Sequence, residues 1–462
     1  MVSSAVFALG SAMTCAALAE PALPDLGSSV REIEPRRKSY VIPAAEIVGF
    51  DFLLNRIDRN LYGSEYEVTP STIRRNLRHG WVVDNDPYKI NQLLHPYQGS
   101  MYHGFARSAG LEFWESLGYT FAGSAMWEIA GENTPPSKND QVASGVAGSF
   151  LGEVLFRMAS LVLEKGEGGK FWRELYAGAI SPPTAFNRHG FADRFSEIFN
   201  SKNPEYYSRV QVGTSATTQH AQGTSTETRH SELMADFSMD YGLPGKTGYH
   251  YDRPFDYFSF QVTASSESVI ESMSTRGLLI GTDYEVGENY RGIWGLYGTY
   301  DYISPQLFRV SSTALSLGTT AQWRLSNSIV AQGTVLAGVG YAGVGTLHGT
   351  QDQLDYHYGI APQGLLALRL IFGDRASLDV TGREFFVSGV SGAGGGGHDN
   401  IGRADFSFTL RLLREHAIAF KYLWSRRDPS YPGVNDFSQS HGTFGVYYAY
   451  LGNQRFGAVD WR

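Results

Sequence analysis

Four side chains between residues 95 and 132 are of the types that carry acid–base or nucleophilic chemistry. Glu128 and Glu132 are one helical turn apart, and Ser124 precedes Glu128 by the same interval, so the three can share one helix face. His95 lies upstream of them. Two carboxylates can divide acid and base roles, and a serine beside a histidine can act as a nucleophile. The candidate catalytic residues are therefore His95, Ser124, Glu128 and Glu132.

The same residues have a structural interpretation. Two carboxylates on one face repel each other unless a cation, a proton or an arginine lies between them. Arg107 or Arg157 could supply that charge, and we favour ion pairing over metal binding because charged groups inside proteins are usually paired. A hydrogen bond from Ser100 or Ser124 to His95 requires a proximity that sequence spacing does not impose. Whether the chain is an enzyme stays open at this point.

A wider set of polar residues in the same region is expected to bind a ligand or to hold helices together. Glu153 and Arg157 are four residues apart, in the order that favours an intrahelical ion pair. Ser137 follows two prolines as a helix N-cap would, and Asp140 stands three residues later, so Asp140 is interpreted as structural. The whole set of ligand or structural candidates is Asn91, Tyr102, His103, Arg107, Asp140, Glu153 and Arg157.

Motifs that would name a reaction are absent from the sequence. His95 and His103 do not have a zinc spacing, and neither H-E-x-x-H nor a phosphate-binding glycine loop occurs. There is no G-x-S-x-G nucleophile elbow. The single cysteine, Cys15, lies in the N-terminal apolar segment, so the mature chain is expected to have no thiol for catalysis, disulfides or metal ligation. We expect no metal and no cofactor.

Helical patterns that position these side chains run from about residue 46 to residue 200. Small residues four apart allow one helix backbone to approach another closely, and we interpret them as packing positions rather than as a ligand site. They are Gly104 and Ser108, Ala106 and Gly110, and Ser144, Gly148 and Gly152.

From about residue 205 onward the apolar residues recur with period two. One segment sets Phe406, Phe408, Leu410 and Leu412 against Ser407, Thr409 and Arg411. A second sets Phe258, Phe260 and Val262, which we expect to point outward, against Ser259, Gln261 and Thr263. Asp236, Asp240 and Arg369 fall on the polar side of similar segments. Strands with one apolar and one polar face are typical of a barrel embedded in lipid.

The fold class predicted from this alternation is mainly β, an outer-membrane antiparallel β-barrel of about twelve strands, preceded by an α-helical domain that packs on or in the barrel. Backbone groups in lipid must all be paired, so such a sheet has to close. A Gly-rich loop at 388–402 is expected on the outer side. A two-layer soluble β-sandwich also alternates and is the competing fold.

Composition favours the barrel. Aromatic residues make up 13% of the 462 residues, with 27 Tyr, 27 Phe and 53 Gly, while charged residues are only 18%. This mixture is typical of membrane barrels with aromatic girdles. The formal net charge of -8 gives no sign of a nucleic-acid partner.

The N-terminus has the pattern of an export signal. An apolar stretch from Ala5 to Leu18 ends in a small-x-small sequence, so residues 1–19 are predicted to be a signal peptide. Residues 20–45 contain proline and mixed charge and are predicted to be a linker. No run of 18 apolar residues follows, so no spanning helix is expected.

Residues 84–160, about a sixth of the chain, resemble the bacterial family catalogued as domain of unknown function 3943. The resemblance rests on NDPYKINQLLHPYQGSMYHGFARSAGLEFWES, GSAMWEIAGE, PPSKND and GSFLGEVLFR. It implies a cell-envelope protein and names no reaction. By position, the family pattern marks Asn91, His95, Pro96, Gly99, Tyr102, Ala106, Arg107, Gly110, Ser124, Trp127, Glu128, Glu132, Ser137, Asp140, Gly152, Glu153 and Arg157.

The sequence thus predicts a Gram-negative outer-membrane protein with a helical domain at 46–200 and a barrel at 205–462. The leading hypothesis for its function is that the helical domain, periplasmic or within the barrel, plugs or gates the barrel or binds an envelope ligand. The alternative is a lipid- or lipopolysaccharide-modifying hydrolase that uses His95, Ser124, Glu128 and Glu132, and a third is an assembly scaffold. Expected partners are outer-membrane lipids and the barrel-assembly machinery, and the sequence favours no oligomeric state.

Overall fold

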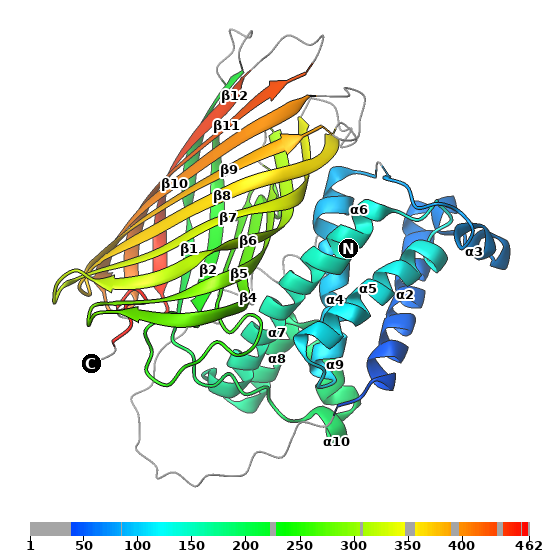
Figure 1. Ribbon diagram of the computed structural model, residues 1–462, viewed down its shortest axis with the longest axis horizontal. Coiled ribbons are helices and arrows are strands. Elements are labelled where there is room, and N and C mark those ends of the chain that lie inside the picture. Colours follow the sequence, from blue (N-terminus) through cyan, green and yellow to red (C-terminus); the bar gives the residue numbers. More distant parts are fainter. Residues whose placement is uncertain are drawn as a thin grey trace. The chain divides into compact units, whose positions relative to one another are not determined.

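The computed structural model describes residues 38–84, 86–221, 228–304, 308–346, 356–389, 397–431, 438–453 and 455–460. The predicted signal peptide and residues 20–37 of the predicted linker lie outside this part of the chain. The chain divides into two compact units (Figure 1). The helical unit runs to Ser201 but omits the segment Asn85–Leu94, which belongs to the barrel unit together with Lys202 and the residues after it.

The helical unit contains α2 (Val41–Tyr62), α3 (Pro70–Asn76), α4 (His95–Ser108), α5 (Phe113–Ala130), α6 (Lys138–Asp140), α7 (Gly148–Lys165), α8 (Lys170–Ile180), α9 (Pro182–Gly190) and α10 (Ala192–Phe195). A 3-10 turn, η1, covers Ser64–Tyr66, and two π-helical segments are η2 (Ile90–Leu94), in the barrel unit, and η3 (Gln141–Ala147). Helix α2 begins at Val41, so residues 41–45 are helical although the sequence predicts a linker there.

Helices α4 and α7 approach each other at small residues. A Cβ atom at Gly148 would lie 2.6 Å from Gly99 Cα, and one at Gly152 would lie 2.7 Å from His103 Cβ. A Cβ atom at Gly99 would overlap the carbonyl oxygen of Ser144. These approaches are closer than side-chain carbons tolerate, so the packing interpretation of Gly148 and Gly152 is confirmed.

A continuous helix of 28 residues, Lys138–Lys165, runs through α6, η3 and α7. It is long and apolar enough to cross a membrane by length and composition, which the sequence did not lead us to expect. However, 89% of its most apolar window is buried within the protein. Because the core helix of a folded domain has the same properties, we treat it as a core helix.

In the barrel unit, the described residues form twelve strands, each paired antiparallel with the next, and β12 pairs with β1 to close the barrel. They are β1 (Tyr206–Ala221), β2 (Thr228–Tyr241), β3 (Phe258–Ser265), β4 (Ser272–Val286), β5 (Tyr290–Ile303), β6 (Phe308–Arg324), β7 (Ile329–Thr346), β8 (Tyr356–Phe372), β9 (Ala376–Ser388), β10 (His398–Leu413), β11 (His416–Ser430) and β12 (Gln439–Leu451). The predicted strand number and topology are confirmed.

The two ends of the barrel differ in the length of their connections. The end where β1 starts and β12 stops carries short turns at 287–289, 325–328, 373–375 and 414–415, and one long connection, 242–257. The opposite end carries the longer loops, among them 389–397, of which residues 390–396 lie outside the described residues. In outer-membrane barrels the short turns face the periplasm and the longer loops face outward. The outward position of the Gly-rich loop stays a prediction, and residues 398–402, predicted as part of that loop, belong to β10.

Side chains alternate across the barrel wall. Phe406, Phe408, Leu410 and Leu412 are exposed on the outside, while Ser407 and Thr409 between them are buried inside. In β3, Gln261 and Thr263 contact Asp236 on the lumen side, as predicted. An apolar exterior, a polar interior and a closed sheet place this barrel in the outer membrane.

Two aromatic residues of β3 point outward, as predicted, but are covered there. Phe258 and Phe260 lie on the face opposite Gln261 and Thr263, and both are buried. Neighbouring rings of β2 account for part of this burial, because Phe258 stacks on Tyr241 at 4.8 Å and Phe260 lies 6.2 Å from Phe237.

Candidate functional site

A buried cluster of opposite charges joins α4 to α7 within the helical unit. Arg107 on α4 donates through Nε to Glu153 Oε2 at 2.7 Å and through Nη2 to Oε1 at 3.2 Å. Arg157, one turn after Glu153, donates to Oε1 at 2.7 Å, which is the intrahelical pair that the spacing predicts. His103 Nε2 lies 3.1 Å from Glu153 Oε2. Three side chains from the predicted set thus meet at the carboxylate of a fourth.

The electrostatics of this cluster follow from burial and pairing. Burial alone raises the pKa of Glu153, but Arg107 and Arg157 outweigh it and hold that pKa well below its usual range. Burial lowers the pKa of His103, against the opposing effect of Glu153. The two guanidinium groups also lie over aromatic rings, with Arg107 4.7 Å from the Phe156 ring and Arg157 5.2 Å from the Phe199 ring. Each charged side chain of the cluster has a hydrogen-bond partner, and both guanidinium groups also contact aromatic rings. This arrangement suits a structural role.

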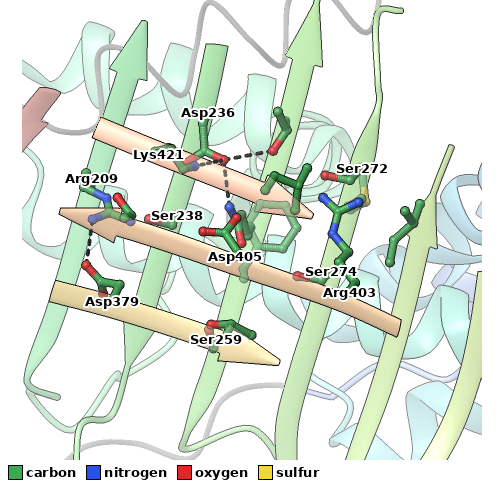
Figure 2. Close-up of a pocket in the computed structure, with 18 of the residues that line it drawn as sticks. Arg209, Asp236, Ser238, Ser259, Ser272, Ser274, Asp379, Arg403, Asp405 and Lys421 are labelled. Carbon is green, nitrogen blue, oxygen red and sulfur yellow. Dashed lines mark hydrogen bonds and ion pairs between the residues drawn. The ribbon is translucent and has the colours of Figure 1, made fainter. Parts of the chain in front are cut away.

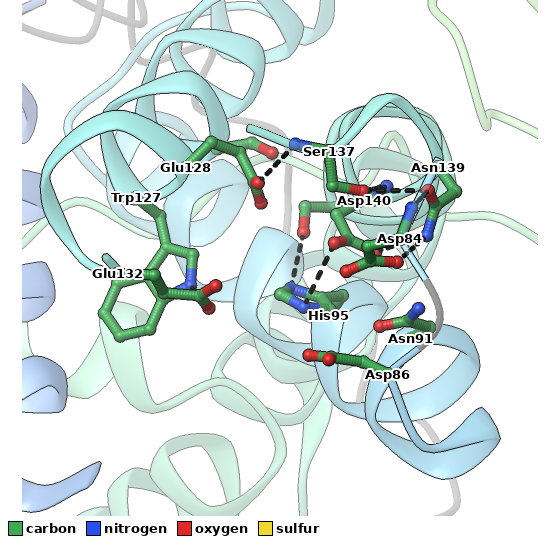
Figure 3. A network of polar contacts seen from close by, with 12 residues as sticks. Asp84, Asp86, Asn91, His95, Trp127, Glu128, Glu132, Ser137, Asn139 and Asp140 are labelled. Atoms are coloured by element: carbon green, nitrogen blue, oxygen red, sulfur yellow. Dashed lines mark hydrogen bonds and ion pairs between the residues drawn. The ribbon is translucent and has the colours of Figure 1, made fainter. Parts of the chain in front are cut away.

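A second polar cluster surrounds His95 at the start of α4 (Figure 3). His95 Nε2 lies 3.7 Å from Asp140 Oδ2, and His95 Nδ1 lies 3.4 Å from the hydroxyl of Ser144. The Asn139 amide donates to Asp140 Oδ1 at 3.1 Å and to Asp84 Oδ1 at 2.5 Å. Ser137 caps α6 by accepting from the Asp140 backbone N–H at 3.2 Å, as predicted.

Burial sets the protonation of this second cluster. It lowers the pKa of His95 to about 4, although Asp84 acts in the opposite direction. Burial, together with Asp84 and Glu128, raises the pKa of Asp140 well above its ordinary value. Burial therefore favours the neutral form of both the imidazole and the carboxyl group.

The candidate catalytic residues do not converge on one point. The Ser124 hydroxyl accepts from Gln141 Nε2 at 2.8 Å, and Glu128 Oε2 accepts from the Ser137 backbone N–H at 2.8 Å. Glu132 Oε1 accepts from Trp127 Nε1 at 2.6 Å. The serine nearest His95 is Ser144, which the sequence analysis did not choose, and both arginines offered as partners for the two glutamates lie on Glu153.

Two further candidates have separate surroundings. Tyr102 donates its hydroxyl to Asp51 Oδ1 and accepts from Gln98 Nε2 at 2.6 Å. Asn91 lies in the segment Asn85–Leu94 and donates to the Tyr356 hydroxyl at 2.8 Å. Among the described residues, no group of three or more His, Cys, Asp and Glu side chains has a metal-binding arrangement.

The segment Asn85–Leu94 packs on the outer face of the barrel wall. Tyr300 donates to the Gln92 carbonyl at 2.6 Å, and Gln92 Nε2 donates to the Tyr358 hydroxyl at 2.8 Å. Asp301, the neighbour of Tyr300 in β5, pairs with Arg383 across the lumen. Because successive side chains of a strand point to opposite faces, Tyr300 points outward.

Charged side chains from several strands meet inside the barrel (Figure 2). Arg369 on β8 donates to Asp240 Oδ2 at 3.0 Å and to Asp379 Oδ1 at 2.6 Å. Asp379 also accepts from Arg209 at 3.1 Å. Lys421 Nζ lies 3.5 Å from Asp236. Ion pairs therefore cross the lumen between strands that are far apart in the sequence.

A cavity of about 130 Å³ lies among these side chains. Its lining carries both signs of charge and several hydroxyl groups. The charged residues of the lining are Arg209, Arg276, Arg369, Arg383, Arg403, Lys421, Asp236, Asp240, Glu271, Asp379 and Asp405. Such a lining suits a small hydrophilic solute.

The last described residues fold into the lumen at the short-turn end. Gln322 of β6 donates to the Val459 carbonyl at 2.7 Å and accepts from its N–H at 3.0 Å, and Gln332 of β7 donates to the Gly457 carbonyl at 2.6 Å. Gln332 pairs in register with the lumen residue Arg369, so it faces inward as well. Residues 455–460 are called the tail below.

The long connection 242–257 also reaches into the lumen near the same end. Tyr257 lies 6.1 Å from Tyr297 and packs with Leu336. Tyr297 donates to Thr320 at 3.2 Å, and Thr320 bonds to Thr334 at 3.0 Å, which places these side chains on the inner face. The tail and this connection thus both place residues in the lumen at the end of the barrel that carries the short turns.

The lumen site was only partly visible in the sequence. Asp236, Asp240 and Arg369 were placed on the polar side, but their partners were not identified. Charged residues at alternate positions of otherwise apolar strands, such as Asp379 and Arg403, could have indicated the other lumen residues. A charged side chain of a membrane barrel is tolerated only on the face that lines the water-filled lumen. The tail has no comparable pattern.

Comparisons with known proteins give one family match and several similar solved structures. Residues 80–183 match the family described as domain of unknown function (DUF3943). No curated protein matches the chain. Similar solved structures include the NanC porin (8% identity, 51% of this chain and 98% of that chain, TM-score 0.26) and the translocator domain of the autotransporter NalP from Neisseria meningitidis (15%, 52% and 88%, TM-score 0.24). The TodX monoaromatic hydrocarbon channel is 10% identical, with 54% of this chain and 91% of that chain covered and a TM-score of 0.24.

These structural likenesses are too distant to assign an activity, and the fold assignment rests on the strand pairing of the chain itself. The family match covers α4, α5 and α7 with both polar clusters. Residues 80–183 of this chain thus match the DUF3943 family model, and a twelve-stranded outer-membrane β-barrel follows them.

Proposed function

We propose that the barrel is a channel that binds small hydrophilic solutes in its charged lumen and is closed at the short-turn end by the tail and the connection 242–257. The observation that carries the proposal is the charged cavity. Within the described part of the chain, no ion pair or hydrogen bond is found for Arg403 or Asp405, which line it and interact electrostatically with each other, so both can meet a solute.

Plugging by the helical domain is not part of this proposal. The tail and the connection 242–257 supply the occupied end of the lumen from within the barrel unit. The segment Asn85–Leu94, which also belongs to that unit, meets side chains that point outward. The barrel-assembly machinery stays the expected partner for insertion, since it serves closed barrels of this kind.

No observation on the described residues favours the hydrolase. His95, Ser124, Glu128 and Glu132 are all buried. Each of them contacts a different neighbour, and the described cavities are lined by barrel residues. A reaction on lipid needs a group that substrate can reach.

The experiment measures conductance of the purified full chain and of a variant truncated after Asn453, both in planar phospholipid bilayers. Truncation removes the Gln322 and Gln332 hydrogen bonds to the tail, so we expect the truncated protein to conduct more ions than the full chain. A second variant, Arg403→Gln, is expected to change the ratio of anion to cation permeability, because it removes one positive charge from the cavity.

The matched control is Asp460→Asn, which removes an exposed ion pair to Arg324 and leaves the buried tail contacts in place. Its conductance is expected to equal that of the full chain. A folded barrel is verified for each variant by its heat-dependent mobility in gels. Folded proteins that stay non-conducting with and without the tail would overturn the channel.

A further inference from the structure

Helix α2 exposes an apolar face along its first thirteen residues. The exposed residues of this part are Val41, Ala44, Ala45, Val48, Gly49, Phe52 and Leu53. Every one of them is uncharged and lacks a polar side-chain atom. Val48, Phe52 and Leu53 are exposed by 55%, 62% and 58%. Contiguous apolar surface of this kind marks a contact with another apolar phase.

The opposite face of α2 packs against other helices of the helical unit. Ile47 is buried with Tyr102 and Phe105, and Asp51 accepts a hydrogen bond from Tyr102. Glu46 accepts from Asn187 at 3.3 Å. Both acidic residues of this stretch are thus turned inward and given partners. Rotating the helix to hide Phe52 would carry Asp51 out of its contact, so the apolar face stays outside.

The exposed residues match those that the barrel presents to lipid. Outward-facing Leu317 and Leu366 are exposed by 56% and 58%, close to the values for Leu53 and Val48. The barrel closes around a wet lumen and spans a bilayer, so acyl chains surround this protein wherever it is inserted. Acyl chains are therefore an apolar phase that is always present beside this chain.

Exposed positive charges follow the apolar stretch on α2. Arg56 and Arg59 are the first of them, and Arg56 lies 5.0 Å from the Phe52 ring. Ile57 and Leu61 continue the exposed apolar surface beside them. The stretch from Val41 to Leu53 rises about 18 Å at about 1.5 Å per residue, and half of the hydrocarbon core is about 15 Å. Arginine at the end of an apolar stretch reaches the phosphate level of a membrane.

A smaller patch of the same kind lies on α8. Phe171, Trp172 and Leu175 are exposed at positions one turn apart, next to Lys170. Tryptophan and phenylalanine beside lysine are the residues that helices place at the boundary between headgroups and acyl chains.

We infer that the exposed face of α2 from Val41 to Leu53 is a membrane-contact surface, which packs against the acyl chains of one phospholipid leaflet with Arg56 and Arg59 at its headgroups. The helical unit, which contains most of the residues that match the DUF3943 family, then contacts lipid through its own surface as well. This inference does not depend on whether the barrel conducts.

The test uses the full chain with Cys15→Ser, so that one introduced cysteine is the only thiol. Phe52→Cys lies on the apolar face, and Asn60→Cys lies on the same helix at an exposed position beyond it. Both are labelled with an environment-sensitive fluorophore and reconstituted into vesicles of phosphatidylethanolamine and phosphatidylglycerol. Quenching by nitroxide on the acyl chains and by aqueous iodide is measured for each.

We expect acyl-chain nitroxide to quench the label at Phe52 and iodide to quench it about tenfold less than the label at Asn60. Equal iodide quenching at both positions, with no effect of nitroxide, would overturn the inference. Protection at Phe52 that persists in detergent and grows with protein concentration would also overturn it, because a second copy would then cover the face. Val48→Cys, one turn earlier, repeats the measurement at a smaller side chain in case a label at residue 52 disturbs folding.

Discussion

Arg107 and Glu153 connect α4 to α7 through two parallel hydrogen bonds, Nε to Oε2 at 2.7 Å and Nη2 to Oε1 at 3.2 Å, with both side chains buried. Arg157 binds the same carboxylate from the other side. One glutamate is thus shared by two buried guanidinium groups, and we expect the helical unit to depend on it more than on any exposed pair of charges.

Glu153→Gln is expected to destabilise the helical unit by about 3–5 kcal/mol, because it removes the negative charge that two buried guanidinium groups share. The measurement is denaturant unfolding followed by the helical signal in circular dichroism. Glu112→Gln is the control, since the ion pair from Glu112 to Lys38 is exposed at the surface. A loss of stability no larger than that of Glu112→Gln would contradict this account.

The pH dependence of stability is expected to contain opposite contributions from two buried acids. The folded pKa of Glu153 is lowered, so its stabilisation is complete above the unfolded value of about 4.3 and is lost as pH falls below it. The folded pKa of Asp140 is raised, so Asp140 costs stability as pH rises above about 3.9.

Asp140→Asn should therefore match or exceed the wild-type stability at neutral pH, whereas Glu153→Gln should fall well below it. Unfolding free energies at several pH values between acid and neutral measure both. If Asp140→Asn were as unstable as Glu153→Gln at neutral pH, Asp140 would have to be ionised in the folded protein.

Tyr356→Phe combined with Tyr358→Phe is expected to loosen the segment Asn85–Leu94 from the barrel wall. The two hydroxyls accept hydrogen bonds from Asn91 and Gln92, and a buried donor that loses its acceptor costs about 1–3 kcal/mol. Hydrogen exchange of the segment measures the effect. Tyr422→Phe, on an exposed part of the outer wall, should leave that exchange unchanged.

Arg369→Leu is expected to lower the temperature at which the barrel unfolds. Arg369 joins Asp240 to Asp379 inside the lumen, and its removal leaves Asp240 without that cation. Arg369→Lys keeps the positive charge but not the bidentate donor geometry of the guanidinium group. Its unfolding temperature should therefore fall by less than that of Arg369→Leu. Heat-dependent gel mobility measures the unfolding temperature of both variants. If they unfold at the same temperature as the wild type, the ion pairs of Arg369 do not hold the barrel together.

The sequence alone determined that the second half forms strands with one polar and one apolar face, because period-two alternation such as that at 406–412 requires a sheet. The pairing of β12 with β1 then decided for a closed barrel over a sandwich. It also determined local contacts, including the cap at Ser137 and the pair of Glu153 with Arg157, because these depend on spacing within one helix.

Tertiary structure alone decided which distant groups meet. Glu153 rather than Glu128 receives Arg107, Ser144 rather than Ser124 faces His95, and the tail enters the lumen beside Gln322. Periodicity fixes the face of an element on which a side chain lies, but not the element that packs against that face. Those partners depend on how helices and strands that are far apart in the chain pack together. The spacing of residues along the sequence does not specify which of these elements become neighbours.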